Sequence, residues 1–103
     1  MENQIDIRLQ KEDLNLQLCY DFVQEPDCGG ISLFVGTVRN STAAKKVEGL
    51  EFSAYAPMAI KEMKKIAEEA IRSFQIKKIA IHHGLGSMGI GEIPVIIATA
   101  SPH

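Results

Sequence analysis

The feature that most constrains this chain is the stretch from Gly29 to Asn40, because it reads as a buried strand that ends on a fixed cation. Two glycines open the stretch, and a run rich in β-branched and aromatic residues follows, Ile31-Ser32-Leu33-Phe34-Val35-Gly36-Thr37-Val38. That composition is typical of a mostly buried strand. Arg39 comes where the pattern turns into loop. A guanidinium at the exit of a rigid strand favours an anion site, and the alternative is an ordinary solvated arginine.

Composition indicates one small domain and excludes several classes of protein. The 103 residues are 46% hydrophobic and 23% charged, which is ordinary for a globular domain. A net charge of −2 gives no basic field for nucleic acid. The N-terminus is polar and no apolar run reaches membrane-spanning length, so we expect a cytoplasmic protein without a membrane partner. Cys19 and Cys28 match no zinc pattern and are expected to be reduced thiols.

Alternation and helical periodicity predict an α+β domain with the element order β-α-β-β-α-β-β. Besides the stretch above, the predicted elements are a strand over 5–10, a helix capped by Asp13 and running to about Gln24, a strand over 47–55, a helix over 58–74 with Pro57 in its first turn, a strand over 77–83 and a strand from 93 to 99 or 100. Few helices lie between consecutive strands, so we expect a mainly antiparallel sheet. Both helices are expected to cover one face.

The glycines carry three further expectations. The pair Gly29–Gly30 suits a sharp turn into the strand, and Gly36 lets the backbone bulge or another group approach closely. Four glycines lie between Gly84 and Gly91, but no Lys-Ser/Thr pair follows them and no helix is predicted there. The segment therefore fits neither a P-loop nor a dinucleotide fingerprint, and we expect a hairpin-like connection.

The histidines offer little chemistry by themselves. His82 and His83 are neighbours on a predicted strand, so they point to opposite faces and cannot chelate one metal together. No Ser/His/Asp or Cys/His arrangement with interpretable spacing is present, and no paired carboxylates stand out. We therefore expect no metal and no cofactor. From the residues alone, the sequence indicates an α+β domain with a candidate anion site at Arg39.

Several segments together resemble the large, catalytic subunit of molybdopterin synthase, the MoaE family. They are Gly30–Asn40, Leu50–Met58, His83–Gly86, Gly91–Glu92 and Ser101–His103. Their order, their spacing and the helix between them all fit, and the resemblance covers essentially the whole chain. It implies an α/β-hammerhead-like fold, with a mainly antiparallel sheet and two helices.

The resemblance also implies a reaction, partners and site residues. Members of the family transfer two sulfurs to cyclic pyranopterin monophosphate (precursor Z) and so form molybdopterin. The sulfur comes from the C-terminal thiocarboxylate of a ubiquitin-like small subunit, and the large subunits form a homodimer within a heterotetramer. By resemblance, Arg39 and the backbone around Thr37 and Val38 hold the anionic pterin, His103 lines the same pocket, and Phe34 lies near it.

Two departures from the family pattern bear on activity. In the family, the motif that ends in histidine continues into an arginine, a helix and a segment with the catalytic lysines, and a basic residue usually stands where Gly84 is here. This sequence ends at His103, so we expect a single domain over 1–103 that is truncated relative to the family. Its catalytic residues stay unassigned, and the 103 residues alone are expected to be inactive.

Two other functions stay open at this point. One is a non-catalytic module that binds the pterin or the partner, and the other is a purely structural dimerisation domain. The loop 40–46 is small, polar and basic, which is typical of a mobile connection. Lys45 and Lys46 in that loop are the only lysines expected beside the pocket.

Overall fold

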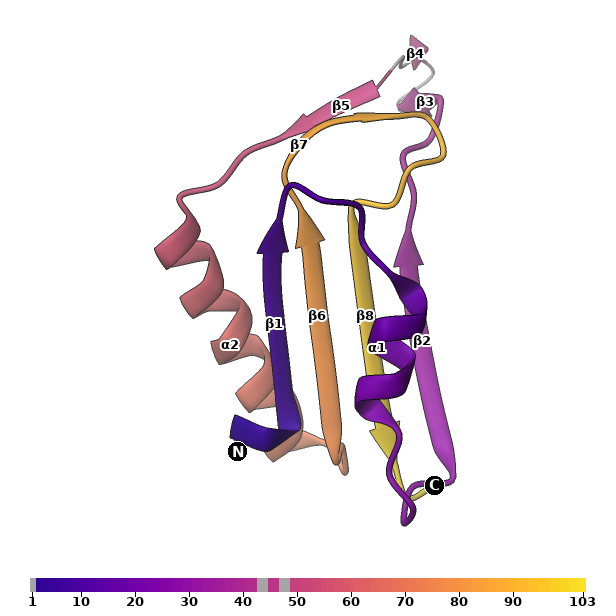
Figure 1. The fold of residues 1–103 in the computed structure, drawn as a ribbon, viewed down its shortest axis with the longest axis vertical. Coiled ribbons are helices and arrows are strands. Elements are labelled where there is room, and N and C mark those ends of the chain that lie inside the picture. The colour runs from indigo at the N-terminus through magenta and orange to yellow at the C-terminus, as the bar shows by residue number, and fades with distance from the viewer. Residues whose placement is uncertain (1, 43–44, 47–48) are drawn as a thin grey trace.

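The computed structural model describes residues 2–42, 45–46 and 49–103, which form one four-stranded sheet, two helices and two small ribbons (Figure 1). The strands are β1 (Ile5–Gln10), β2 (Gly30–Gly36), β3 (Ser41–Thr42), β4 (Lys45–Lys46), β5 (Gly49–Phe52), β6 (Lys78–Gly84), β7 (Gly86–Gly89) and β8 (Val95–Ser101). The helices are α1 (Leu16–Val23) and α2 (Ala56–Ser73), and a short 3-10 turn, Glu2–Gln4, precedes β1. No helix in these described ranges is long and apolar enough to cross a membrane.

The main sheet has the strand order β1-β6-β8-β2. β6 and β2 both pair antiparallel with β8, whereas β1 pairs parallel with β6. The expected α+β class and mainly antiparallel sheet are therefore confirmed. Two details differ from expectation. The segment 84–91 contains β7, which pairs with β5 and so is more than a connection, and the predicted loop 40–46 contains the paired strands β3 and β4.

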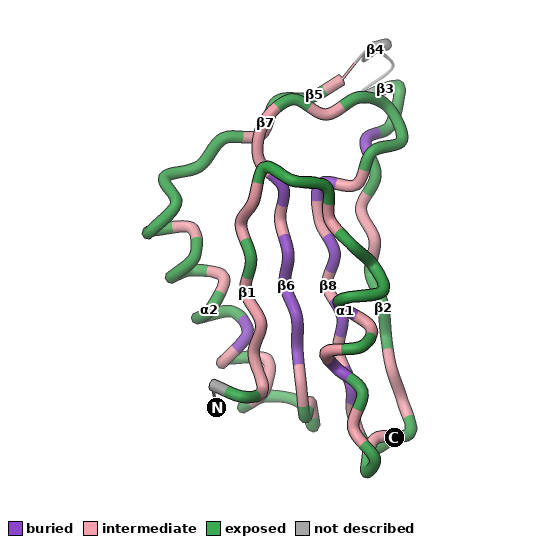
Figure 2. Tube along the Cα trace, in the orientation of Figure 1, coloured by how far each residue is buried: buried purple, intermediate pink, exposed green. Residues whose placement is uncertain are grey.

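The two helices cover opposite faces of the sheet, so the expectation that both cover one face is wrong. Ala80 of β6 packs in a cluster with α1, whereas Ile79 and Ile81 pack in a second cluster with α2. Because side chains alternate along a strand, these clusters lie on the two faces. Figure 2 shows the buried residues concentrated on β6 and β8, the two central strands. Strands that are apolar on both faces need cover on both.

Helix α1 begins later than the sequence predicts. Asn15, and not Asp13, is its N-cap, because the Asn15 Oδ1 accepts a hydrogen bond of 2.9 Å from the Leu18 amide. Asn and Asp are about equally good at this position, so local propensity alone does not distinguish the two. The first turn of α2 does contain Pro57, as predicted.

A buried polar chain ties α1 to the sheet. The Cys19 Sγ lies 3.2 Å from the His82 Nδ1, and the His82 Nε2 lies 2.7 Å from Asp6 Oδ2. Burial raises the pKa of the Cys19 thiol, and the nearby Asp6 carboxylate raises it further. The thiol therefore keeps its proton. With a neutral His82 ring, the thiol S–H donates a hydrogen bond to Nδ1, and the Nε2–H donates to the Asp6 carboxylate. Asp6 also pairs with Arg8 at 3.2 Å.

The pairing of β2 with β8 requires a glycine at the end of β2. The register runs without interruption from Gly30 opposite Ser101 to Gly36 opposite Val95. A Cβ added at Gly36 would lie only 2.7 Å from the Val95 Cγ1. Of the two roles expected for Gly36, the structure therefore supports close approach and not a bulge.

The buried chain predicts a stability difference between the two cysteines. Cys19→Ala removes a fully buried sulfur and leaves the His82 Nδ1 without its hydrogen-bond partner, so we expect a loss of about 2–3 kcal/mol in the free energy of unfolding. Cys28→Ala is the matched control at a half-buried cysteine, with an expected loss of about 1 kcal/mol or less. Urea denaturation at pH 7 measures both, and equal losses would contradict the role given to Cys19.

The close approach at Gly36 predicts an effect of a single methyl group. Gly36→Ala forces Val95 or the strand to shift, and we expect a loss of about 1–3 kcal/mol. Gly89→Ala is the control, because a Cβ there meets no atom of the described residues within 4 Å and its φ is not positive. We expect the control variant to match the parent within about 0.5 kcal/mol. Thermal melting compares the two variants, and an unchanged Gly36→Ala protein would refute the account of this position.

Candidate functional site

The exit of β2 presents Arg39 to solvent from a fixed backbone. Thr37 and Arg39 are exposed on either side of Val38, whose exposed fraction is only 2%. Among the residues that the structure describes, no carboxylate forms an ion pair with the Arg39 guanidinium. A guanidinium of this kind can bind a phosphate through two parallel hydrogen bonds.

The backbone of Val38 is held on both of its polar groups by the segment before β8. The Val38 N–H donates to the Glu92 carbonyl at 3.0 Å, and the Gly91 N–H donates to the Val38 carbonyl at 2.8 Å. The Val38 amide is therefore committed within the chain. Val38 fixes where Arg39 begins, but its own N–H is not free for a ligand.

Phe34 lies on the same strand, with its ring largely uncovered. It pairs with Ile97 of β8, and its exposed fraction is 58%. Ile97 packs with the cluster under α2, so Phe34 lies on the α2 side of the sheet. α2 itself packs on β1 and β6. The edge strand β2 thus carries an exposed aromatic ring on this face.

His103 lies at the other end of the β2–β8 pair. Gly30 is opposite Ser101, and the Gly29 N–H donates to the Pro102 carbonyl at 3.2 Å. A Cβ at Gly30 would lie 3.1 Å from the carbonyl carbon of His103, and neither glycine has a positive φ. The glycine pair therefore makes room for the last two residues of the chain to cross over it, which is a different use from the sharp turn expected.

Arg39 and His103 are consequently far apart within one chain. β2 pairs over seven residues, and at about 3.3 Å per residue the two ends of the pair are about 20 Å apart. Figure 1 shows the C-terminus at the lower end of the sheet and the exit of β2 toward β3 at the upper end. The structure thus brings Thr37, Val38 and Arg39 together, but it does not add His103 to them.

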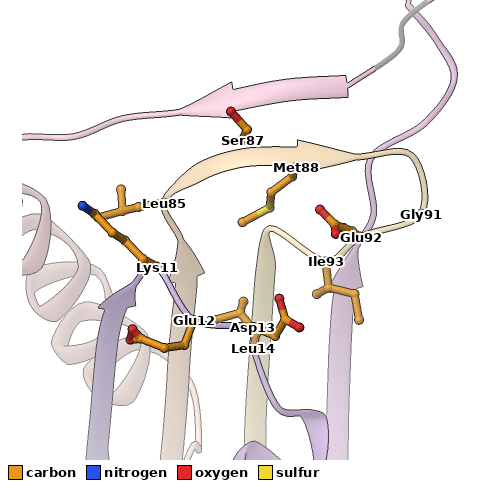
Figure 3. A pocket seen from close by; sticks show the side chains of 10 residues that line it. All are labelled: Lys11, Glu12, Asp13, Leu14, Leu85, Ser87, Met88, Gly91, Glu92 and Ile93. Atoms are coloured by element: carbon orange, nitrogen blue, oxygen red, sulfur yellow. The ribbon is translucent and has the colours of Figure 1, made fainter.

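A cavity of about 290 Å³ lies near the Arg39 end of the sheet, beneath β7 (Figure 3). The connection from β1 to α1 lines one side with Lys11, Glu12 and Asp13, and Met88 and Glu92 line the other. Charges of both signs meet here, so the cavity is no simple anion site. None of Thr37, Val38 and Arg39 lines it.

The histidines of β6 lie on opposite faces, as predicted. His82 belongs to the buried chain under α1, and His83 borders an apolar cavity of about 400 Å³ with its ring edge-on to Phe52 at 5.4 Å. No group of three or more His, Cys, Asp or Glu side chains within the described ranges is placed to hold a metal ion. The side chains of Lys45 and Lys46 lie outside what the structure describes.

The contact between Cys19 and His82 is one that sequence reasoning missed. Sixty-three residues separate the two, and no local spacing signals such a pair. Sequence reasoning also missed the two hydrogen bonds that Gly91 and Glu92 make with Val38, because more than 50 residues separate these positions.

Comparison with known proteins gives the chain a family. The family model described as MoaE protein matches residues 9–103. The molybdopterin synthase catalytic subunit of Taeniopygia guttata is 46% identical over 98 residues, which are 94% of this chain and 63% of that protein. The human molybdopterin synthase catalytic subunit is 42% identical over 97 residues, 94% of this chain and 52% of that protein. The chain thus spans about half to two thirds of the length of these relatives.

Solved structures agree with the sequence relatives. A molybdopterin synthase structure from Staphylococcus aureus superimposes with a TM-score of 0.87 at 32% identity, over 93% of this chain and 70% of that one. A MoaE protein from Burkholderia ambifaria gives a TM-score of 0.85 at 32% identity, over 96% and 65%. The MoaE family model, the curated relatives and these folds agree across nearly the whole chain, which therefore belongs to the MoaE family.

Proposed function

We propose that this chain acts as the large, catalytic subunit of a molybdopterin synthase. In this reaction, sulfur from the C-terminal thiocarboxylate of a small ubiquitin-like subunit is transferred to cyclic pyranopterin monophosphate, which yields molybdopterin. The observation that carries the proposal is the Arg39 guanidinium, which lies on a fixed strand exit and pairs with no described carboxylate. The names of the relatives support the same reading.

The substrate is an anion with a flat ring system, and the residues at this end of β2 suit both parts. Arg39 binds the cyclic phosphate, and the exposed Thr37 lies beside it on the same strand exit. The uncovered ring of Phe34 provides an apolar surface near the site. No metal or cofactor is needed for these roles.

His103 joins this pocket from a second copy of the chain. Within one copy, His103 and Arg39 lie beyond opposite ends of the β2–β8 pair, and those ends are about 20 Å apart. β2 is an edge strand, and a two-fold axis across its edge would align two β2 strands antiparallel. The exit of one β2 would then lie next to the start of the other, where His103 crosses Gly30. The exposed side chain of Leu33 in the middle of β2 favours such a contact.

The sulfur donor is a second subunit in this proposal. One chain in a protein-protein complex of subunits 1 and 2 of the molybdopterin-converting factor from Helicobacter pylori has the same fold, with a TM-score of 0.66 at 20% identity. We propose a heterotetramer of two large and two small subunits in the cytoplasm, a reducing compartment that suits the two free cysteines. The catalytic group is not assigned to any of these 103 residues.

The role of Arg39 predicts a loss of substrate affinity without a loss of fold. Arg39→Ala should weaken the binding of cyclic pyranopterin monophosphate by about 1.5–3 kcal/mol, or about 10- to 150-fold in Kd. Arg72→Ala is the matched control, because Arg72 pairs with Glu69 on the exposed face of α2. Calorimetry measures both Kd values. Equal affinity of the Arg39→Ala and parent proteins, at an unchanged melting temperature, would remove Arg39 from the site.

The shared pocket predicts that two variants with weak pterin binding complement each other. Arg39→Ala and His103→Ala proteins should each bind the pterin weakly, yet a refolded mixture should regain part of the binding, because a mixed dimer contains one site with neither change. The double variant mixed with Arg39→Ala is the control and should regain none. A mixture no better than its components would contradict a shared pocket, as would sedimentation that shows only monomer at micromolar concentration.

A further inference from the structure

A tight turn between β7 and β8 is closed by both the backbone and the side chain of Glu92. The Glu92 N–H donates to the Gly89 carbonyl at 3.1 Å, and the Glu92 Oε2 accepts from the Gly89 N–H at 2.8 Å. Gly91 has a φ of +85°, as the third residue of a type II turn requires. Both polar groups of the Gly89 backbone are thereby bonded to the same glutamate.

The same turn is what holds Val38. Gly91 and Glu92 are the two residues whose backbones bond the Val38 carbonyl and amide. The side chain of Val38 is also buried, so its backbone bonds and its side-chain packing together fix its position. Arg39 follows directly, and the placement of its guanidinium depends on where Val38 is held. A change in the shape of the turn would therefore be passed to Arg39 through two hydrogen bonds.

We propose that Glu92 is a positioning residue for Arg39. Its carboxylate closes the turn, the turn holds Val38, and Val38 fixes the start of the Arg39 side chain. Glu92 touches no substrate in this account. The proposal deepens the proposed function and rests on it for the identity of the anion.

Removing the Glu92 carboxylate should change the affinity for the anion in opposite directions, depending on whether the carboxylate acts through its charge or by positioning Arg39. A carboxylate near an anion site repels the anion, so removing its charge should strengthen binding if charge alone matters. If the carboxylate acts as the acceptor that closes the turn, its removal should weaken binding. Glu92→Gln keeps an acceptor oxygen at the same distance from the backbone and removes the charge, so it separates the two effects.

The experiment compares Glu92→Ala, Glu92→Gln and Glu51→Ala in the protein combined with its small subunit. Glu51 is the matched control, because its carboxylate accepts from the Ser87 hydroxyl at 3.0 Å on the neighbouring ribbon and lies outside the turn. We expect Glu92→Ala to raise the Kd for cyclic pyranopterin monophosphate about three- to tenfold, since one hydrogen bond of the turn is lost. Glu92→Gln should restore most of the affinity, and Glu51→Ala should match the parent.

A second readout does not depend on the pterin. Amide hydrogen exchange at Val38 should accelerate about tenfold in Glu92→Ala and stay near the parent rate in Glu92→Gln and Glu51→Ala. If the parent protein binds no pterin, the proposed function fails, while the exchange rates still decide whether Glu92 holds Val38. In an Arg39→Ala background, Glu92→Ala should cost no further affinity.

Three results would overturn the proposal. Tighter pterin binding in Glu92→Ala would assign the residue an electrostatic effect alone. Unchanged exchange at Val38 in Glu92→Ala would break the link between the turn and the strand exit. A further loss of affinity from Glu92→Ala in the Arg39→Ala background would show that Glu92 acts by a route other than Arg39.

Discussion

The antiparallel pairing of β2 with β8 is the constraint on which the rest of the site depends. Its register puts Gly36 against Val95 at one end and Gly30 against Ser101 at the other. Each end then carries one of the two side chains that the family pattern singles out, Arg39 beyond Gly36 and His103 beyond Ser101. Since neither end can shift without breaking the ladder, a single chain cannot bring these residues together. A site that uses both must be built from two copies.

Rigidity at the Arg39 end comes from backbone contacts, and these contacts come from distant parts of the sequence. Val38 is bonded on both polar groups by the turn that precedes β8. The Glu92 carboxylate closes that turn by accepting a hydrogen bond from the Gly89 amide. A guanidinium on such a support loses less freedom on binding an anion than one on an open loop, which favours affinity. In the proposed function, this support makes the solvent-exposed Arg39 a fixed binding group.

The sequence allowed the local features to be predicted, and the long-range ones were missed. The helix after Pro57 and the opposed directions of His82 and His83 follow from composition and alternation, and the structure has them. The strand that leads to Arg39 is present too, but it is an edge strand with its three central residues exposed, and the expectation that it is mostly buried is wrong. The helix placement differs from expectation because both faces of β6 are apolar: Ala80 packs in one buried cluster, and Ile79 and Ile81 pack in the other. The Cys19–His82–Asp6 chain and the hold on Val38 join segments far apart in the chain, and no spacing rule indicates such contacts.

The most direct test of the shared site is a crystal structure of the protein, assembled with its small subunit, with cyclic pyranopterin monophosphate bound. The account predicts the phosphate on the Arg39 guanidinium of one copy, with the imidazole of His103 of the partner subunit lining the same pocket. It also predicts that Val38 keeps both of its backbone bonds to the turn. A pterin bound within a single copy, away from Arg39, would contradict the account.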